Sequence, residues 1–146
     1  MPLGSTFEGD LLNLFLCAKA ISNIADNAAS SPSTATWSSL HTADPSSGTQ
    51  GTSELSVTGY ARTAVVRSTA GFTVTGSGPA TASPVSAITF PQCTSTSTAT
   101  VTHWGIGLSS ASTSGKLLAC GTVSPNINIS QNVTPQLTTA SSVTLS

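Results

Sequence analysis

The feature that most constrains the fold is a change of sequence pattern near residue 37. Before that point, apolar residues recur at helical spacing in one segment. After it, strand-length runs of β-branched and apolar residues are separated by turns rich in Gly, Pro and Ser, and no convincing helical pattern follows. The sequence therefore predicts a mainly β protein preceded by one N-terminal α-helix.

The β part is expected to contain about seven or eight strands, which suits a single antiparallel β-sandwich of jelly-roll or Ig-like type. Period-two alternation at Ile88 and Phe90 places both side chains on one strand face. The same spacing places Trp104, Ile106 and Leu108 on one face, so we expect Trp104 in the core. The expected strands are residues 37–42, 60–67, 72–75, 85–90, 99–108, 117–123 and 143–145, with a weaker one inside 126–137.

The expected helix, residues 6 to about 25, carries more apolar residues than one buried helix face needs. Ser5 and Glu8 have the spacing of a capping box at its start. The apolar excess predicts a helix that is either sandwiched within the fold or docked on another subunit. Five of its residues are candidate interface positions: Leu11, Leu12, Leu14, Leu16 and Ile21.

A polar connector at residues 27–36 separates this helix from the strands. We therefore divide the chain into residues 1–36, the helix and its connector, and residues 37–146, the β-sandwich domain. The helix is expected to mediate docking while the sandwich folds with little help from it.

A long loop at residues 43–57 contains a proline and two glycines and is expected to lie outside the sandwich, where it can touch a partner. Asp44, Pro45 and Glu54 of this loop are further candidate interface residues. For Asp44, the proline that follows favours a turn in which the carboxylate bonds to a nearby backbone amide. Glu54 has the character of a solvated loop charge.

Charge and hydropathy exclude two classes of partner. Only 6% of the residues are charged and the net charge is -1, so no face carries the positive field that binds nucleic acid. The longest apolar run, residues 11–21, is too short to cross a membrane. Glu8 and Asp10 precede that run where a signal peptide carries basic residues, so we expect synthesis in the cytoplasm.

Residues that could support catalysis are few and scattered. His41 and His103 each lie in an expected strand, where a structural histidine is the commoner case. Cys17, Cys93 and Cys120 are too widely spaced for a zinc cluster and odd in number for a disulfide framework, so we expect them to be buried.

Gly105 and Gly107 form a Gly-x-Gly without the third glycine of a dinucleotide-binding motif, which favours close backbone approach or a bulge in a strand. The sequence thus predicts no enzyme activity, no catalytic residue, no cofactor and no metal site.

Four short blocks carry a resemblance to a known family. Residues 40–45 read LHTADP, residues 59–62 GYAR, residues 89–91 TFP and residues 101–106 VTHWGI. In this order, and with the helix ahead of them, they resemble a family of small virion structural proteins of tailed bacteriophages. The resemblance covers nearly the whole chain and implies a virion component, described in that family as tail fibre or head decoration, without catalytic residues.

Three functions are compatible with these observations. We prefer a capsid decoration (cement) protein on the capsid exterior, synthesised in the host bacterial cytoplasm, which binds the major capsid protein and forms a homotrimer. The alternative is a tail-fibre or baseplate component whose Ser/Thr/Gly-rich loops contact the host surface. A small hydrolase that uses His41 or His103 is the third, and the sequence contains no Gly-x-Ser-x-Gly elbow to support it.

Overall fold

The computed structural model of the protein describes residues 5–20, 33–76 and 79–145. These residues form one helix and nine strands, so the chain is mainly β with an N-terminal helix, as the sequence predicts. The strand pairs β1–β6, β6–β7, β3–β4, β4–β9 and β5–β8 are antiparallel. The elements are α1 (Ser5–Cys17), β1 (Ala35–His41), β2 (Thr63–Val66), β3 (Phe72–Thr75), β4 (Ala80–Pro84), β5 (Ile88–Thr89), β6 (Ala99–Gly107), β7 (Leu117–Ile129), β8 (Gln136–Leu137) and β9 (Val143–Leu145).

The chain forms two compact units. Unit 1 comprises Met1–Ala35, Val66–Ala87 and Thr138–Ser146, and unit 2 comprises Thr36–Val65 and Ile88–Leu137. This division differs from the expected one at residue 36, because unit 1 also takes in three strands from later in the chain. Those strands join the N-terminal segment because α1 packs against them.

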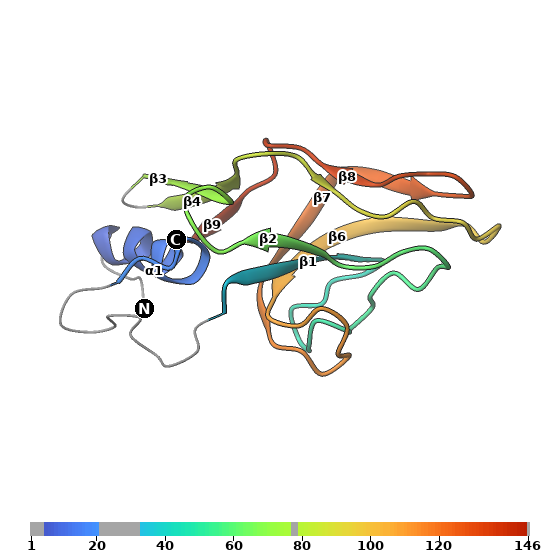
Figure 1. Ribbon diagram of the computed structural model, residues 1–146, viewed down its shortest axis with the longest axis horizontal. Helices are drawn as coiled ribbons and strands as arrows, with labels where there is room; N and C mark the ends of the chain where they lie inside the picture. Colours follow the sequence, from blue (N-terminus) through green and yellow to red (C-terminus); the bar gives the residue numbers. More distant parts are fainter. Residues whose placement is uncertain (1–4, 21–32, 77–78, 146) are drawn as a thin grey trace. The chain divides into compact units, whose positions relative to one another are not determined.

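In unit 1, α1 covers a three-stranded sheet of order β3-β4-β9 (Figure 1). Leu12 and Leu16 of the helix are buried, as are Phe72, Ala80 and Ala82 of the sheet. The small alanine side chains of β4 allow the helix to approach closely. The buried side of α1 thus helps to form the core of unit 1, and Leu12 and Leu16 are not exposed for docking in this structure.

The helix ends at Cys17, earlier than the expected residue 25. Ala18 has a left-handed backbone conformation, with φ of 55°, and residues 18–20 are not helical. Arg67 donates hydrogen bonds to the carbonyls of Leu14 and Phe15 in the last turn. Ile21 and residues 27–32 of the expected connector lie outside the described residues. No helix in the described ranges is long and apolar enough to span a membrane.

Unit 2 contains a four-stranded sheet of order β2-β1-β6-β7 and a two-stranded sheet, β5-β8. In Figure 1, β8 lies across from β1 and β6, and the buried side chains of this unit come from both sheets. Leu40 pairs with Trp104, and Ser38 pairs with Ile106, so these residues share one sheet face. The apolar core of unit 2 consists of Leu40, Leu55, Ile88, Phe90, Cys93, Val101, Trp104, Ile106, Ile129 and Leu137.

The expected core position of Trp104 is confirmed, because its side chain is 2% exposed. The expectation for Leu108 is wrong, since 42% of that side chain is exposed. Strand β6 ends at Gly107, and its register with β7 shifts between Ile106 and Gly107. This irregularity interrupts the alternation that would have placed Leu108 beside Ile106.

The second face of the four-stranded sheet is covered by the segment that follows β1. Gln50 and Pro45 of this segment are fully buried. A Cβ atom on Gly107 would lie 2.2 Å from Cδ of Gln50, and one on Gly105 would lie 2.9 Å from Nε2 of His41. The Gly-x-Gly therefore permits close approach, as predicted. Residues 43–57, expected outside the sandwich, cover the outer face of this sheet: Pro45, Gln50 and Leu55 are buried, whereas Asp44 and residues 46–49 are exposed.

Candidate functional site

A pocket with a volume of about 510 Å³ lies in unit 2 between residues 54–62 and the loop that joins β6 to β7. Most of its wall comes from one segment, which runs from the loop after β1 to the start of β2. The opposite wall consists of two residues of the β6–β7 loop, Ser110 and Ala111. The lining residues are Glu54, Leu55, Ser56, Val57, Thr58, Tyr60, Ala61, Arg62, Ser110 and Ala111.

Glu54 and Arg62 form a two-point ion pair in this pocket. Nε of Arg62 donates to Oε1 of Glu54 at 2.7 Å, and Nη2 donates to Oε2 at 2.6 Å. The Arg62 side chain is 2% exposed and the Glu54 side chain 17%. The hydrogen bonds that Arg62 donates to Glu54 raise the pKa of Arg62 above its usual value, so the guanidinium stays charged.

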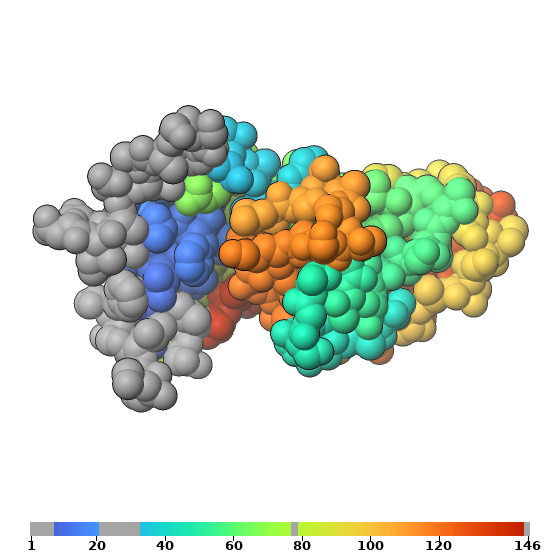
Figure 2. All heavy atoms as spheres, turned by 90° about the horizontal axis from the view of Figure 1, so that it is seen from below, coloured from blue at the N-terminus to red at the C-terminus, as the bar shows by residue number. Residues whose placement is uncertain are grey.

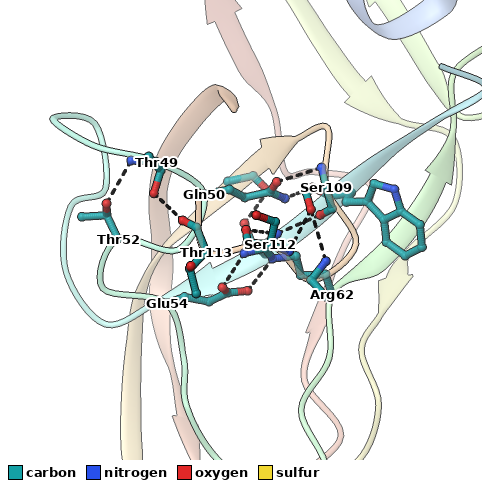
Figure 3. Close-up of polar contacts among 12 residues, drawn as sticks. Thr49, Gln50, Thr52, Glu54, Arg62, Ser109, Ser112 and Thr113 are labelled. Atoms are coloured by element: carbon teal, nitrogen blue, oxygen red, sulfur yellow. Dashed lines mark hydrogen bonds and ion pairs between the residues drawn. The ribbon is translucent and has the colours of Figure 1, made fainter. Parts of the chain in front are cut away.

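Arg62 also fixes the β6–β7 loop. Its Nη1 donates to the carbonyl oxygens of Ser109, at 2.8 Å, and Ser112, at 3.2 Å (Figure 3). One guanidinium thus joins the carboxylate on one wall of the pocket to the backbone of the loop that forms the other wall. Charge-assisted hydrogen bonds of this kind are stronger than neutral ones and hold both loops in one geometry.

Tyr60 orients the carboxylate of Glu54. Its hydroxyl donates to Oε1 of Glu54 at 3.1 Å and accepts a hydrogen bond from the backbone amide of Leu40 at 2.9 Å. Its ring packs against Phe90, with ring centroids 6.1 Å apart. Burial raises the pKa of Tyr60 well above its usual value, so the phenol remains a donor.

Gln50 and Thr49 hold the same two loops together at a second point. The Gln50 side chain donates to the carbonyl of Trp37 at 2.9 Å and accepts from the amide of Ser109 at 3.1 Å. The Thr49 hydroxyl donates to the carbonyl of Thr113 at 2.6 Å. In Figure 2 the loop after β1 (teal) and the β6–β7 loop (orange) form one continuous surface.

A tight turn shapes the segment that lines the pocket. The amide of Tyr60 donates to the carbonyl of Val57 at 3.2 Å, and Gly59 has a φ of 92°, which is the pattern of a type II turn. A Cβ atom on Gly59 would lie 2.4 Å from the carbonyl oxygen of Gln92. Only glycine satisfies both the positive φ and this close approach.

The three candidate loop residues have different environments. Asp44 is exposed and its carboxylate accepts from the amide of Ser46 at 2.8 Å, which confirms the expected turn. That hydrogen bond lowers the pKa of Asp44. Pro45 is buried, so it presents no surface to a partner. Glu54 is ion-paired and largely buried, and the expectation of a solvated charge is wrong.

The candidate helix residues divide between core and surface. Leu12 and Leu16 are buried in unit 1, whereas Leu11 and Leu14 are half-buried. Phe15, which the sequence analysis did not single out, is 43% exposed.

His41 and Ser39 form a buried pair that has the geometry of a nucleophile and its base. Nε2 of His41 lies 2.9 Å from Oγ of Ser39, and Nδ1 lies 2.9 Å from the carbonyl oxygen of Thr52. Both side chains are fully buried, so a substrate has no access to them. Burial also lowers the pKa of His41, which keeps the ring neutral. The pair fits a structural role.

Two other expectations concern the remaining titratable side chains. His103 is half-buried, and its Nδ1 lies 2.8 Å from the hydroxyl of Thr102. Cys17 and Cys93 are buried as expected, whereas Cys120 is only half-buried. Within the described ranges, no three His, Cys, Asp or Glu residues are grouped so that they could hold a metal ion.

Sequence reasoning identified Glu54 as a candidate residue but missed its partners Arg62 and Tyr60. A signal for the pairing was present, because opposite charges eight positions apart are conspicuous in a chain with so few charged residues. The contribution of Ser109 and Ser112 could not have been found in this way, since only their backbone carbonyls take part.

No curated protein sequence matches the chain. A protein family does match, and it covers all but the first 14 residues, including every strand and the pocket described above. Because residues 15–146 match the family described as podophage GP4 fiber I protein gp80, the chain belongs to this family of bacteriophage structural proteins.

Proposed function

We propose that this protein is a subunit of a phage tail fibre that contacts the host surface. The observation that carries this proposal is the family match over residues 15–146, because the family description names a fibre protein. It supports the tail-fibre alternative better than the capsid decoration that the sequence analysis preferred.

The construction of the loops supports a contact function. Glu54, Arg62 and Gln50 hold the loop after β1 and the β6–β7 loop in place through side-chain hydrogen bonds. Binding residues are often found on loops that a rigid scaffold positions. Loops that are already ordered lose little conformational entropy when they bind a partner.

The subunit carries out no chemistry in this proposal. The absence of catalysis is proposed because Ser39 and His41 are buried, and among the described residues this pair most resembles a catalytic dyad. A nucleophile needs an approach path for its substrate, and this serine has none.

The subunit assembles with copies of itself, as a homotrimer. Leu11, Leu14 and Phe15 support self-association, because they retain exposed apolar surface on one side of α1. Burial of such surface between copies is the common way in which symmetric oligomers form.

Cryo-electron microscopy of the parent virion tests the proposal. We expect density for this chain in fibres attached to the tail, at a copy number of a few dozen or fewer. A distribution of hundreds of copies over the capsid exterior, in contact with the major capsid protein, would overturn the fibre proposal in favour of head decoration. A virion without the chain would overturn both.

A further inference from the structure

We propose that the pocket lined by residues 54–62 and by Ser110 and Ala111 binds a neutral saccharide, with the Glu54 carboxylate as acceptor for a sugar hydroxyl. This inference deepens the proposed function and rests on it, because it names the class of host-surface molecule that the fibre would contact.

The charges of the pocket disfavour an anionic ligand. Arg62 is the one cation among the lining residues, and it already donates four hydrogen bonds, to Glu54, Ser109 and Ser112. With its side chain 2% exposed, it has no accessible face for a phosphate, sulfate or carboxylate. The partly exposed charge is the carboxylate of Glu54, which repels anions.

A metal cation is also disfavoured. Glu54 is the one carboxylate among the lining residues, and a bound calcium ion takes six to eight oxygen ligands, of which carboxylates supply several. Two atoms of the Arg62 guanidinium already occupy one side of the Glu54 carboxylate. The pocket therefore favours an uncharged ligand.

The hydrogen-bonding groups that remain free match a polyhydroxylated molecule. Oε1 of Glu54 accepts from both Tyr60 and Arg62, whereas Oε2 accepts from Arg62 alone among the described residues. Since each carboxylate oxygen can accept about two hydrogen bonds, Oε2 retains one acceptor position. The side-chain hydroxyls of Ser56 and Thr58 have no hydrogen-bond partner within the described part of the chain.

Small apolar side chains complete the pattern. Val57, Ala61 and Ala111 line the pocket beside these polar groups, and the two alanines are exposed. A sugar ring presents hydroxyls at its rim and C–H groups on its faces, so it needs donors, acceptors and apolar contact within one small site. The pocket supplies all three without a large exposed aromatic surface, since the ring of Tyr60 packs against Phe90.

The expected affinity for one sugar is low. A monosaccharide has only about 12 heavy atoms with which to make contacts, so its Kd is expected to be on the order of a millimolar. Several copies of the pocket on one fibre would raise the overall avidity by roughly 100-fold or more if they bind a repeating surface glycan together.

Titration of the full-length, ¹⁵N-labelled protein with monosaccharides, followed by amide chemical shifts, tests the proposal. The neutral probes are D-glucose, D-galactose, D-mannose, N-acetyl-D-glucosamine and L-rhamnose, and D-glucuronate is the anionic probe. We expect at least one neutral sugar to shift amides of residues 54–62 and 109–112 in a saturable way, and glucuronate to bind more weakly. Absence of a saturable shift with every neutral sugar, or tighter binding of glucuronate, would overturn the proposal.

Two matched variants locate the binding. Ala61→Trp fills the pocket without removing a member of the ion pair, and it should weaken binding by roughly tenfold or more. Ala64→Trp places the same side chain on an exposed position of β2 outside the lining set, and it should bind as the unmodified protein does. If the Ala61→Trp protein binds sugar as tightly as the unmodified protein, or if both variants lose the same amount of sugar affinity, the pocket is not the binding site.

Glu54→Gln tests the role of the carboxylate as acceptor. If this variant remains folded, it should bind neutral sugars more weakly and lose the discrimination against glucuronate. If it unfolds, the Ala61→Trp comparison still decides the location of the site.

The two proposals fail in different ways. If the virion carries the chain in its fibres and no neutral sugar binds, the saccharide inference is wrong and the fibre assignment stands. If the chain covers the head and the pocket binds sugars, the fibre assignment is wrong and the chemistry of the pocket stands.

Discussion

Glu54 and Arg62 are eight residues apart in the chain, and the two-point ion pair between them closes the intervening segment into a loop that contains Tyr60. The phenol of Tyr60 bonds to the same carboxylate. The pocket wall is therefore organised around a single carboxylate, and that carboxylate is also its most exposed charged group. In the proposed saccharide site, stability and ligand binding are therefore coupled at this position.

Glu54→Gln should lower the free energy of unfolding by about 3 kcal/mol, because it leaves the buried guanidinium of Arg62 without its counter-charge. Urea denaturation measures the change. Asp44→Asn is the control, since Asp44 is exposed and an asparagine can accept the same hydrogen bond from Ser46. It should change stability by less than about 0.5 kcal/mol. Equal effects of the two substitutions would contradict a structural role for the ion pair.

Gly107→Ala should lower the free energy of unfolding by about 1–3 kcal/mol, because the added methyl group overlaps Gln50 and the carbonyl of Lys116. Gly121→Ala on the neighbouring strand is the matched control. A Cβ there would lie 3.5 Å from Nε1 of Trp104, which is an ordinary contact distance. Thermal unfolding of both variants checks the difference, and a Gly107→Ala protein as stable as the Gly121→Ala protein would contradict it.

Strands with strong β propensity could be predicted from the sequence. Residues 72–75 and 143–145 form β3 and β9 with the expected bounds, and β6 departs from expectation by one residue. Strand β4 was missed because its residues are small or polar and end in Pro84, so no local preference marks them. Ala80 and Ala82 adopt the strand because they pack beneath α1 and pair with β3 and β9.

The covering of the four-stranded sheet could not be predicted from local patterns. Gln50 is buried because Gly107 leaves space for it and because Trp37 and Ser109 satisfy its amide. These partners are 13 and 59 residues away in the chain. A single sequence contains no signal for such long-range polar contacts, so a polar loop of this kind is expected on the surface.

Leu16→Ala should destabilise the protein by about 2–5 kcal/mol, since Leu16 is buried between α1 and the sheet of unit 1. Phe15→Ala, one residue away, should change the stability of the isolated subunit by less than about 1 kcal/mol, because the Phe15 side chain is largely exposed. If α1 mediates self-association, Phe15→Ala should reduce the oligomer fraction in sedimentation experiments. An unchanged oligomer would place the subunit interface elsewhere.

Trp104→Ala should cost about 3–5 kcal/mol, because the indole is fully enclosed and faces Leu40 across the β1–β6 pair. Trp37→Ala on β1 removes a half-buried indole of the same size and should cost clearly less. Chemical denaturation, followed by circular dichroism so that the loss of a tryptophan does not affect the signal, measures both. A similar cost for the two substitutions would mean that burial does not determine the effect.

The buried His41 predicts a dependence of stability on pH. Burial lowers its folded-state pKa below the usual value of 6.5, so above pH 6.5 the ring is neutral in both states and its contribution to stability is fully present. As the pH falls below 6.5, the unfolded state binds a proton more readily than the folded state. The free energy of unfolding then decreases by up to about 1.4 kcal/mol per pH unit, until the folded-state pKa is reached.

His41→Gln removes this titrating group and should flatten the decrease just below pH 6.5, whereas His103→Gln on the paired strand leaves His41 in place and should preserve it. Urea denaturation at a series of pH values compares the slopes. Because Gln can still accept from Ser39, the folded state of the His41→Gln protein should persist at neutral pH. If the two variants show the same slope below pH 6.5, protons do not enter at His41, and the buried Ser39–His41 pair is not what makes the protein sensitive to acid.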